Sequence, residues 1–285
     1  MTDQKIPYVI TSVLNAIRGK LTVRFMMLSF SRLLGGKLHL TQIDPGKKNS
    51  DELLRAVGNS RTNCVIFSGS GLDVTPEREA DVFTRAAKYI PDKPKVWRPC
   101  HPKQAPKYLV DELSDFFHYF FFERVSNAGN PKYRGGFYDE WAKQWHEVEE
   151  APPYNRGFPV DTFVLNLKLS AKLFVRPRRV GREEVVRSSL NSMSAGRVVY
   201  FEYSGKYGGV DLVRAFDKER KAQRIDGTLI VGGGIDTKEK AFETLTAGAD
   251  AIVVGNTLYR CQQSGDYTPF YSTIEGAMRA VELTT

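Results

Sequence analysis

The sequence predicts an α/β protein in which a single domain, residues 1–285, folds as a (βα)8 TIM barrel. Short apolar runs alternate with segments of helical spacing along the chain. The apolar runs lack the alternation of a strand with one wet face, which is typical of parallel strands covered by helices. No linker, repeat or low-complexity tract marks a domain boundary. A doubly wound open sheet would show the same alternation and is the alternative architecture.

The predicted strands are short apolar or β-rich runs. They are Leu38–Ile43, Cys64–Phe67, Lys95–Trp97, Tyr119–Phe122, Thr162–Leu165, Val198–Glu202, Leu229–Val231 and Ala251–Val254. The predicted helices that follow them are Ser50–Val57, Pro76–Tyr89, Ala105–Leu113, Lys132–Val148, Glu183–Met193, Val210–Gln223, Lys238–Ala247 and Thr268–Val281. Strand and helix units in one such series close most economically into an eight-stranded barrel.

Two further segments fall outside this repeating pattern. We expect an extra N-terminal helix over Ile10–Leu34, which would cover the base or the flank of the barrel. The segment Asn127–Pro159, an insertion after the fourth strand, is long, aromatic and rich in Gly and Pro. Long connections of this kind commonly carry function, so we expect a loop or flap over the strand ends.

The distribution of charge and of cysteines indicates which partners and which location to expect. The formal net charge is +8, but the basic residues are scattered rather than blocked, which favours a solvated basic surface over nucleic-acid binding. The three cysteines are widely spaced and form no CxxC pair, which indicates a reducing, cytoplasmic location. No stretch approaches the roughly 18 consecutive apolar residues of a membrane span, so any membrane contact would be peripheral.

Glycines follow the last two predicted strands. Gly232, Gly233 and Gly234 come after one strand, and Gly255 comes after the next. Without side chains, backbone N–H groups can approach an anion, and the helix after each turn adds its positive end. Strands seven and eight of a barrel are a frequent place for such a phosphate cradle. The alternative is that these glycines only permit tight turns.

Three segments together resemble the geranylgeranylglyceryl phosphate synthase family, which includes the bacterial heptaprenylglyceryl phosphate synthases. They are VGGGIDTKEKAFETLTAGADAIVVGN, VVYFEYSGKYGG and LHLTQIDPGK, and the segments FSGSGLDVT and ERVSNAGNP also fall in the family's order. The resemblance implies a barrel that joins a prenyl diphosphate to a hydroxyl of a phosphorylated glycerol, with Mg²⁺. It also implies contact with membranes through the lipid product, and we expect a homodimer.

Two residues are expected on the metal side of the site. Asp44 ends the first predicted strand, and Mg²⁺ favours one or two carboxylates together with phosphate oxygens. The resemblance adds Ser70, in the loop after the second strand, as a second metal-side contact. A turn or capping role is the alternative for Asp44.

The expected catalytic residues lie on the sixth strand. Glu202 ends the apolar run VVYFE, where burial would raise its proton affinity into the range of a general base. Tyr200 lies on the same strand face and can orient the acceptor or Glu202. A salt bridge from Glu202 to a neighbouring lysine is the alternative.

The resemblance also implies the cage for the acceptor's phosphate. Its members are Ser204, Gly233, Gly234, Gly255 and Asn256.

Departures from the family pattern bear on the acceptor. Gly46 stands where the family has a polar residue, Leu167 and Lys168 stand where it has Asn-Pro and Gly or Asp, and Lys206 replaces a neutral residue. Added cations would suit a more negative acceptor. The phosphoglycerate prenyltransferase of moenomycin-type antibiotic biosynthesis is similar in fold and joins a farnesyl group to 3-phosphoglycerate. We therefore expect 3-phosphoglycerate and farnesyl diphosphate as substrates, with sn-glycerol 1-phosphate as the alternative acceptor. Each lysine could equally be a solvated surface residue.

Other functions explain less of the sequence. A sugar-phosphate isomerase would share the glycine cradle but would need two acid–base groups, and Glu202 has no second strand-end carboxylate beyond Asp44. A nucleic-acid binder would explain only the basic charge. The four histidines are dispersed, which argues against a zinc site or a His-based triad. The run Phe116–Glu123 fits a core strand better than a wall of the prenyl trough.

Overall fold

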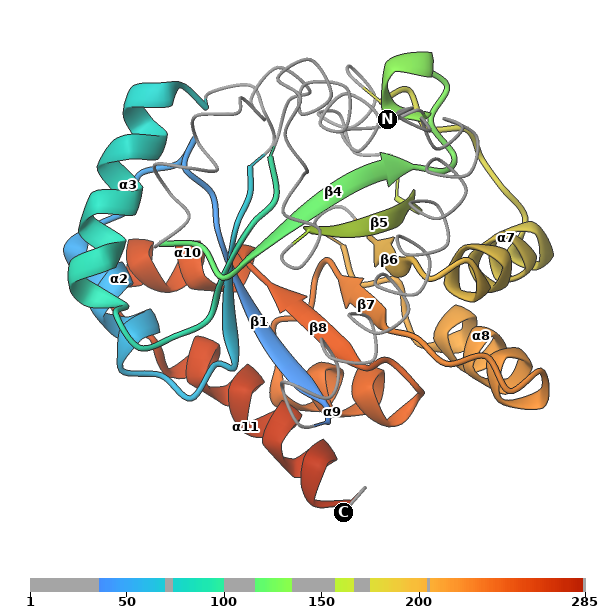
Figure 1. Cartoon of the computed structure of the whole chain (residues 1–285). Helices are drawn as coiled ribbons and strands as arrows, with labels where there is room; N and C mark the ends of the chain where they lie inside the picture. Colours follow the sequence, from blue (N-terminus) through green and yellow to red (C-terminus); the bar gives the residue numbers. More distant parts are fainter. Residues whose placement is uncertain are drawn as a thin grey trace, which may run out of the picture.

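A computed structural model describes residues 36–69, 74–99, 116–134, 157–166, 175–203 and 206–283. Its centre is a closed barrel in which eight parallel strands pair in chain order and the last pairs with the first (Figure 1). The strands are β1 (Leu38–Ile43), β2 (Cys64–Phe67), β3 (Lys95–Trp97), β4 (Tyr119–Val125), β5 (Gly157–Val164), β6 (Val198–Glu202), β7 (Leu229–Gly232) and β8 (Ala251–Val254). The predicted barrel is confirmed, and the open sheet is excluded.

Helices surround the barrel on the outside (Figure 1). Those described are α2 (Asp51–Gly58), α3 (Pro76–Tyr89), α7 (Arg182–Ser194), α8 (Asp211–Ala222), α9 (Lys238–Thr246), α10 (Asn256–Ser264) and α11 (Thr268–Glu282). Three of them begin at a Ser or Thr whose side chain accepts a hydrogen bond from the backbone N–H three residues further on: Ser50, Thr75 and Thr237. These caps follow directly from the sequence, so the helix starts are set locally.

The hydrophobic core has two layers, because side chains alternate between the two faces of each strand. The layer inside the barrel contains Leu38, Leu40, Cys64, Ile66, Val96, Phe121, Phe158, Val160, Val198, Tyr200, Ile230, Ala251 and Val253. The second and larger layer lies between the strands and the helices and includes Phe67, Trp97 and Phe201. Residues at the carboxyl ends that share the inward phase, such as Glu202, therefore point into the mouth of the barrel.

Three strands differ from the predicted bounds, and one of them, β7, differs only by the single residue Gly232. β4 continues to Val125, three residues beyond the predicted end, so Glu123 is a strand residue. β5 begins at Gly157 rather than Thr162 and ends at Val164. Gly157 and Pro159 weaken the strand signal, and Pro159 is tolerated because pairing with β6 starts only at Val160. The end of the predicted insertion Asn127–Pro159 therefore belongs to the sheet.

Several expectations fall on other parts of the chain. The N-terminal helix Ile10–Leu34, the helix Ala105–Leu113 and most of the predicted insertion lie outside the described residues. α10 was not expected from the sequence, and it places Asn256 at a helix start. Within the part of the chain that the structure describes, no helix is long and apolar enough to span a membrane.

Candidate active site at the carboxyl ends of the strands

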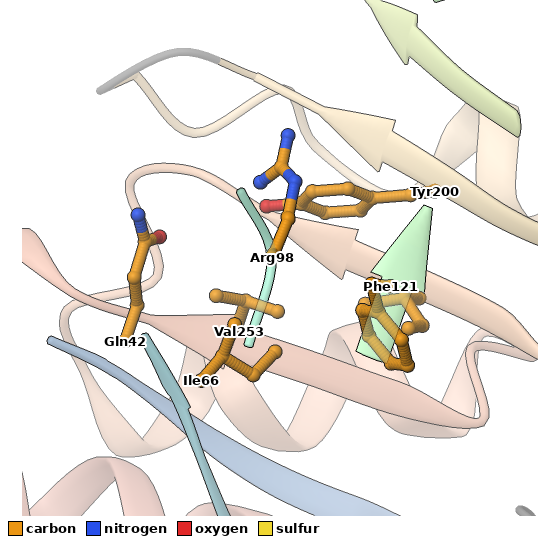
Figure 2. A pocket seen from close by; sticks show the side chains of 7 residues that line it. Gln42, Ile66, Arg98, Phe121, Tyr200 and Val253 are labelled. Carbon is orange, nitrogen blue, oxygen red and sulfur yellow. The ribbon is translucent and has the colours of Figure 1, made fainter. Parts of the chain in front are cut away.

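A pocket opens at the mouth of the barrel. Its lining comes from strands around the whole barrel: Gln42, Ile66, Arg98, Phe121, Tyr200, Ile230 and Val253 (Figure 2). The floor is apolar, whereas Gln42, Arg98 and Tyr200 bring polar groups to it. The pocket is too small for a whole substrate, so these residues mark the bottom of the barrel mouth.

Glu202 is bound by an arginine rather than by a lysine. Nη2 of Arg98 donates to Oε2 of Glu202 at 3.0 Å. The same guanidinium binds Glu123 at two points, with Nε donating to Oε2 at 3.1 Å and Nη2 donating to Oε1. The side chains of Arg98 and Glu123 are 11% and 10% exposed, and that of Glu202 is 28% exposed. The predicted salt bridge of Glu202 therefore exists, but with a different partner.

This ion pair changes the expected environment of Glu202. We expected an apolar setting for Glu202, whereas its side chain lies in a salt bridge with the guanidinium of Arg98. Burial by itself would lower the pKa of Arg98, but the carboxylates of Glu123 and Glu202 outweigh it and raise the pKa well above its ordinary value. Arg98 is thus a permanent cation.

Tyr200 lies where the sequence places it, on the inward face of β6. The guanidinium carbon of Arg98 lies 5.0 Å from the centre of its ring, and Figure 2 shows the two side chains next to each other. Burial, followed by the charge of Glu202, raises the pKa of Tyr200 above its ordinary value. Its hydroxyl therefore stays protonated near neutral pH and can donate a hydrogen bond.

Arg98 and Glu123 were missed in the sequence. We argued that Glu202 has no second strand-end carboxylate beyond Asp44, and this is wrong, because Glu123 lies in β4 and its carboxylate lies one guanidinium away from that of Glu202. The available signal was a charged residue at the end of each of two apolar runs, KVWR and FFFE. The inward phase of these residues becomes visible only once the strand bounds are known.

The loops after β6 and β7 touch at the predicted glycines. Gly233 and Gly234 have φ angles of 106° and 67°, which favour glycine. A Cβ on Gly233 would lie 2.0 Å from the carbonyl oxygen of Tyr203, and a Cβ on Gly234 would lie 2.0 Å from the backbone N of Tyr207. Tight loop packing is thus a sufficient reason for both glycines, and phosphate binding by them stays a prediction.

The start of α10 carries the other predicted cage residues. Gly255 is the N-cap and Asn256 is the first helical residue. Nζ of Lys47 donates to Oδ1 of Asn256 at 3.3 Å and lies 4.3 Å from the ring centre of Tyr259. A cation beside a helix N-terminus favours an anion there. Lys47, which comes from the loop after β1, was not singled out in the sequence.

Asp44 is buried at the end of β1, at 6% exposure. Its backbone N–H donates to Oη of Tyr259 at 2.6 Å, and its Oδ1 accepts from the N–H of Gly46 at 2.9 Å. The turn role that we left open is therefore present. A Cβ on Gly69 would lie 2.3 Å from Oδ1, so the loop after β2 passes close to the carboxylate.

The carboxylate of Asp44 suits one edge of a magnesium site. Magnesium takes one or two carboxylates and fills its other positions with phosphate oxygens and water. The described residues contain no group of three or more His, Cys, Asp or Glu side chains that could hold a metal alone. Asp44 thus fits a magnesium ion that arrives with a diphosphate, and does not fit an all-protein cage.

The remaining predicted residues are only partly placed. Lys206 is exposed, and its backbone lies against Gly234 in the loop after β6. Ser70, Lys168 and Ser204 lie outside the described residues. Of the two lysines predicted to lie on one rim of the barrel, the structure describes Lys206.

Comparisons of the sequence and of the structure with known proteins find the same family. Residues 31–270 match the PcrB family. A geranylgeranylglyceryl phosphate synthase from Methanocella arvoryzae is 31% identical over 226 residues, which cover 78% of this chain and 90% of that protein. A heptaprenylglyceryl phosphate synthase from Anoxybacillus flavithermus is 28% identical over 224 residues, covering 78% and 89%. The crystal structure of (S)-3-O-geranylgeranylglyceryl phosphate synthase from Thermoplasma acidophilum with sn-glycerol-1-phosphate matches at a TM-score of 0.67 and 21% identity, over 91% of this chain and 97% of that one. At this level of identity, the structural match shows that the two chains share a fold.

Proposed function

Because the chain belongs to the PcrB family, we propose that it joins an allylic prenyl diphosphate to a hydroxyl of a phosphorylated three-carbon acceptor and releases diphosphate. The chain is an enzyme, a prenyltransferase of the type that its relatives represent. One observation carries the proposal: Glu202, in a salt bridge with Arg98, lies beside two glycine-rich loops at the mouth of the barrel. A base next to a phosphate cradle is what this reaction needs.

Glu202 acts as the general base. The acceptor oxygen forms a bond to the allylic carbon, the bond from that carbon to the diphosphate oxygen breaks, and the hydroxyl proton moves to Glu202. The Tyr200 hydroxyl, which stays protonated, donates to an acceptor oxygen and orients it. The apolar floor of the pocket keeps water away while positive charge develops on carbon.

The leaving diphosphate is expected near β1. Asp44 would hold Mg²⁺, which neutralises diphosphate charge when bound. Lys47 lies beside Asn256 and would face the same phosphate groups or those of the acceptor. These two side chains come from one loop, so donor binding depends on the conformation of Asp44–Lys47.

The relatives support glycerol phosphate as the acceptor, and they do so better than our expectation of 3-phosphoglycerate. The charge of the site agrees, because one guanidinium between two carboxylates leaves a net negative charge that disfavours an additional carboxylate. The second candidate, 3-phosphoglycerate with a farnesyl donor, is supported by the exposed cation Lys206 beside Gly234.

A direct assay tests the proposal. Purified protein is incubated with farnesyl or geranylgeranyl diphosphate and with sn-glycerol 1-phosphate, sn-glycerol 3-phosphate or 3-phosphoglycerate, with and without Mg²⁺. We expect an ether product with glycerol 1-phosphate and diphosphate release that requires both substrates. A product with 3-phosphoglycerate alone would select the second candidate. No product from any pair would overturn the proposed function.

A further inference from the structure

Arg98 is held between two carboxylates at the mouth of the barrel. It donates to both oxygens of Glu123 and, through Nη2, to Oε2 of Glu202. A two-point contact between guanidinium and carboxylate fixes the orientation of the guanidinium as well as its distance. Glu202 is thus oriented by an arginine that a second glutamate holds in place.

We propose that Arg98 is a positioning residue that aims Glu202 at the acceptor hydroxyl, and that Glu123 fixes Arg98 for this purpose. The inference rests on the proposed function, in which Glu202 is the base. Arg98 binds Oε2, which directs the other oxygen, Oε1, toward the acceptor. Without the two-point contact to Glu123, the guanidinium could turn and carry Glu202 with it.

The same contacts set the charges around Glu202. Arg98 places a positive charge beside Glu202, and Glu123 places a negative charge against the same guanidinium. Once the acceptor proton has moved to Glu202, Arg98 and Glu123 are left as a neutral pair. No uncompensated charge is then stranded in the buried mouth of the barrel.

Two tyrosines are the other ionisable groups near these three among the described residues. Tyr200 lies against Arg98, and Tyr133, which follows β4, faces Glu123. Burial, with the nearby glutamates adding to it, raises the pKa of both tyrosines above the ordinary value. Neither tyrosine therefore titrates between about pH 5 and 9. The acceptor's phosphate, with a second pKa of about 6, titrates in this range but is the same for every variant, so a difference in the acidic limb between variants reports the enzyme.

The test is the pH dependence of kcat/KM for variants that change the charge around Glu202 in opposite directions. Arg98→Met removes the cation, so we expect the acidic limb to move up by about one to three pH units. Glu123→Gln removes a like charge, so the limb moves down. Arg98→Lys keeps the charge but loses the two-point contact, so kcat falls by about 100-fold, as for a misplaced catalytic group, while the limb stays in place.

A matched control lies on the same strand. Arg124 follows Glu123 but points to the other face, where Nε donates to Oδ1 of the buried Asp161 at 2.8 Å. Asp161 also has Arg197, whose Nη1 lies 3.5 Å from Oδ1. Arg124→Met removes an ion pair of the same kind outside the site. We expect a lower Tm and an unchanged pH–rate profile.

The outcomes separate this inference from the proposed function. If Glu202→Gln keeps full activity, the proposed function fails. If Glu202→Gln is inactive but Arg98→Met and Glu123→Gln leave the acidic limb in place, only the inference is overturned. An acidic limb that moves up in Arg98→Met and down in Glu123→Gln, and that stays in place in Arg124→Met, would support the inference. If Arg98→Met does not fold, the variants Arg98→Lys and Glu123→Gln test the inference instead. An acidic limb that stays in place in Glu123→Gln would contradict the positioning role of Arg98. An undiminished kcat in Arg98→Lys would contradict it as well.

Discussion

The two sides of the barrel mouth offer different chemistry. The loops after β7 and β8 present glycines and a helix start. The ends of β1, β3 and β4 present the side chains Asp44, Arg98 and Glu123 instead. Glu202, at the end of β6, lies at the border and binds across to Arg98. The glycine side should therefore be sensitive to an added carbon where the loops pack closely, at Gly233 and Gly234, whereas the side-chain side should be sensitive to changed charge.

Removing the carboxylate at the border should have the largest effect. We expect Glu202→Gln, which keeps the size of the side chain, to lower kcat by about 100-fold to 10,000-fold, the usual contribution of a general base. The KM of the acceptor should change little. Single-turnover rates with saturating substrates measure the chemical step. A rate as high as that of the unchanged protein would show that Glu202 is not the general base.

Adding a methyl group should lower the stability of the protein at Gly233 much more than at Gly255. Gly233→Ala places a Cβ 2.0 Å from a carbonyl oxygen at positive φ, so we expect a loss of stability above the roughly 1–3 kcal/mol of backbone strain alone. At Gly255 the nearest atom is Cβ of Gln42 at 3.3 Å, so Gly255→Ala should unfold with nearly the original Tm. Thermal unfolding of both variants checks the difference. Equal Tm values would contradict the close packing of the two loops.

Changing one charge on the opposite side should affect the donor selectively. Asp44→Asn keeps an oxygen for the N–H of Gly46 but removes the negative charge. We expect the Mg²⁺ concentration for half-maximal rate to rise by about 10-fold to 100-fold, at least the cost of losing a residue that orients a metal ligand. The acceptor's KM serves as the internal control. An effect on the acceptor alone would place Asp44 outside the donor site.

The smallest effect is expected at the exposed lysine. Lys206→Ala should change the ratio of kcat/KM for 3-phosphoglycerate to that for glycerol 1-phosphate by about fivefold or less, because an exposed charge contributes roughly 1 kcal/mol at most. Competition between the two acceptors in one reaction measures the ratio directly. A change much larger than this would make Lys206 the residue that selects the acceptor.

Sequence reasoning succeeded where the signal is local. Pro76–Tyr89 was predicted with the bounds of α3, because Thr75 and Pro76 mark its start and the apolar spacing follows. Leu38–Ile43 and Ala251–Val254 were also predicted with their observed bounds, because short apolar runs between turns are strands in such a fold. It failed at the start of β5, where Gly157 and Pro159 oppose the strand and pairing with β4 stabilises residues that lie before the first pair with β6.

The site divides in the same way. The positions of Tyr200, Glu202 and the glycines in the barrel could be predicted from the sequence, because each lies within one segment whose pattern shows the strand and its end. The partner of Glu202 could not, because Arg98 lies 104 positions away along the chain. Nothing in either segment indicates the other.

The sequence by itself determined the succession of strands and helices, the inward face of β6 and the need for bare backbone after β7, since these depend on neighbouring residues. Only the tertiary structure decided which charges meet. Closing the sheet brings the ends of β3, β4 and β6 to one mouth, where one guanidinium binds two glutamates. Coulomb attraction depends on distance in space, and distance in space is what a linear sequence does not contain.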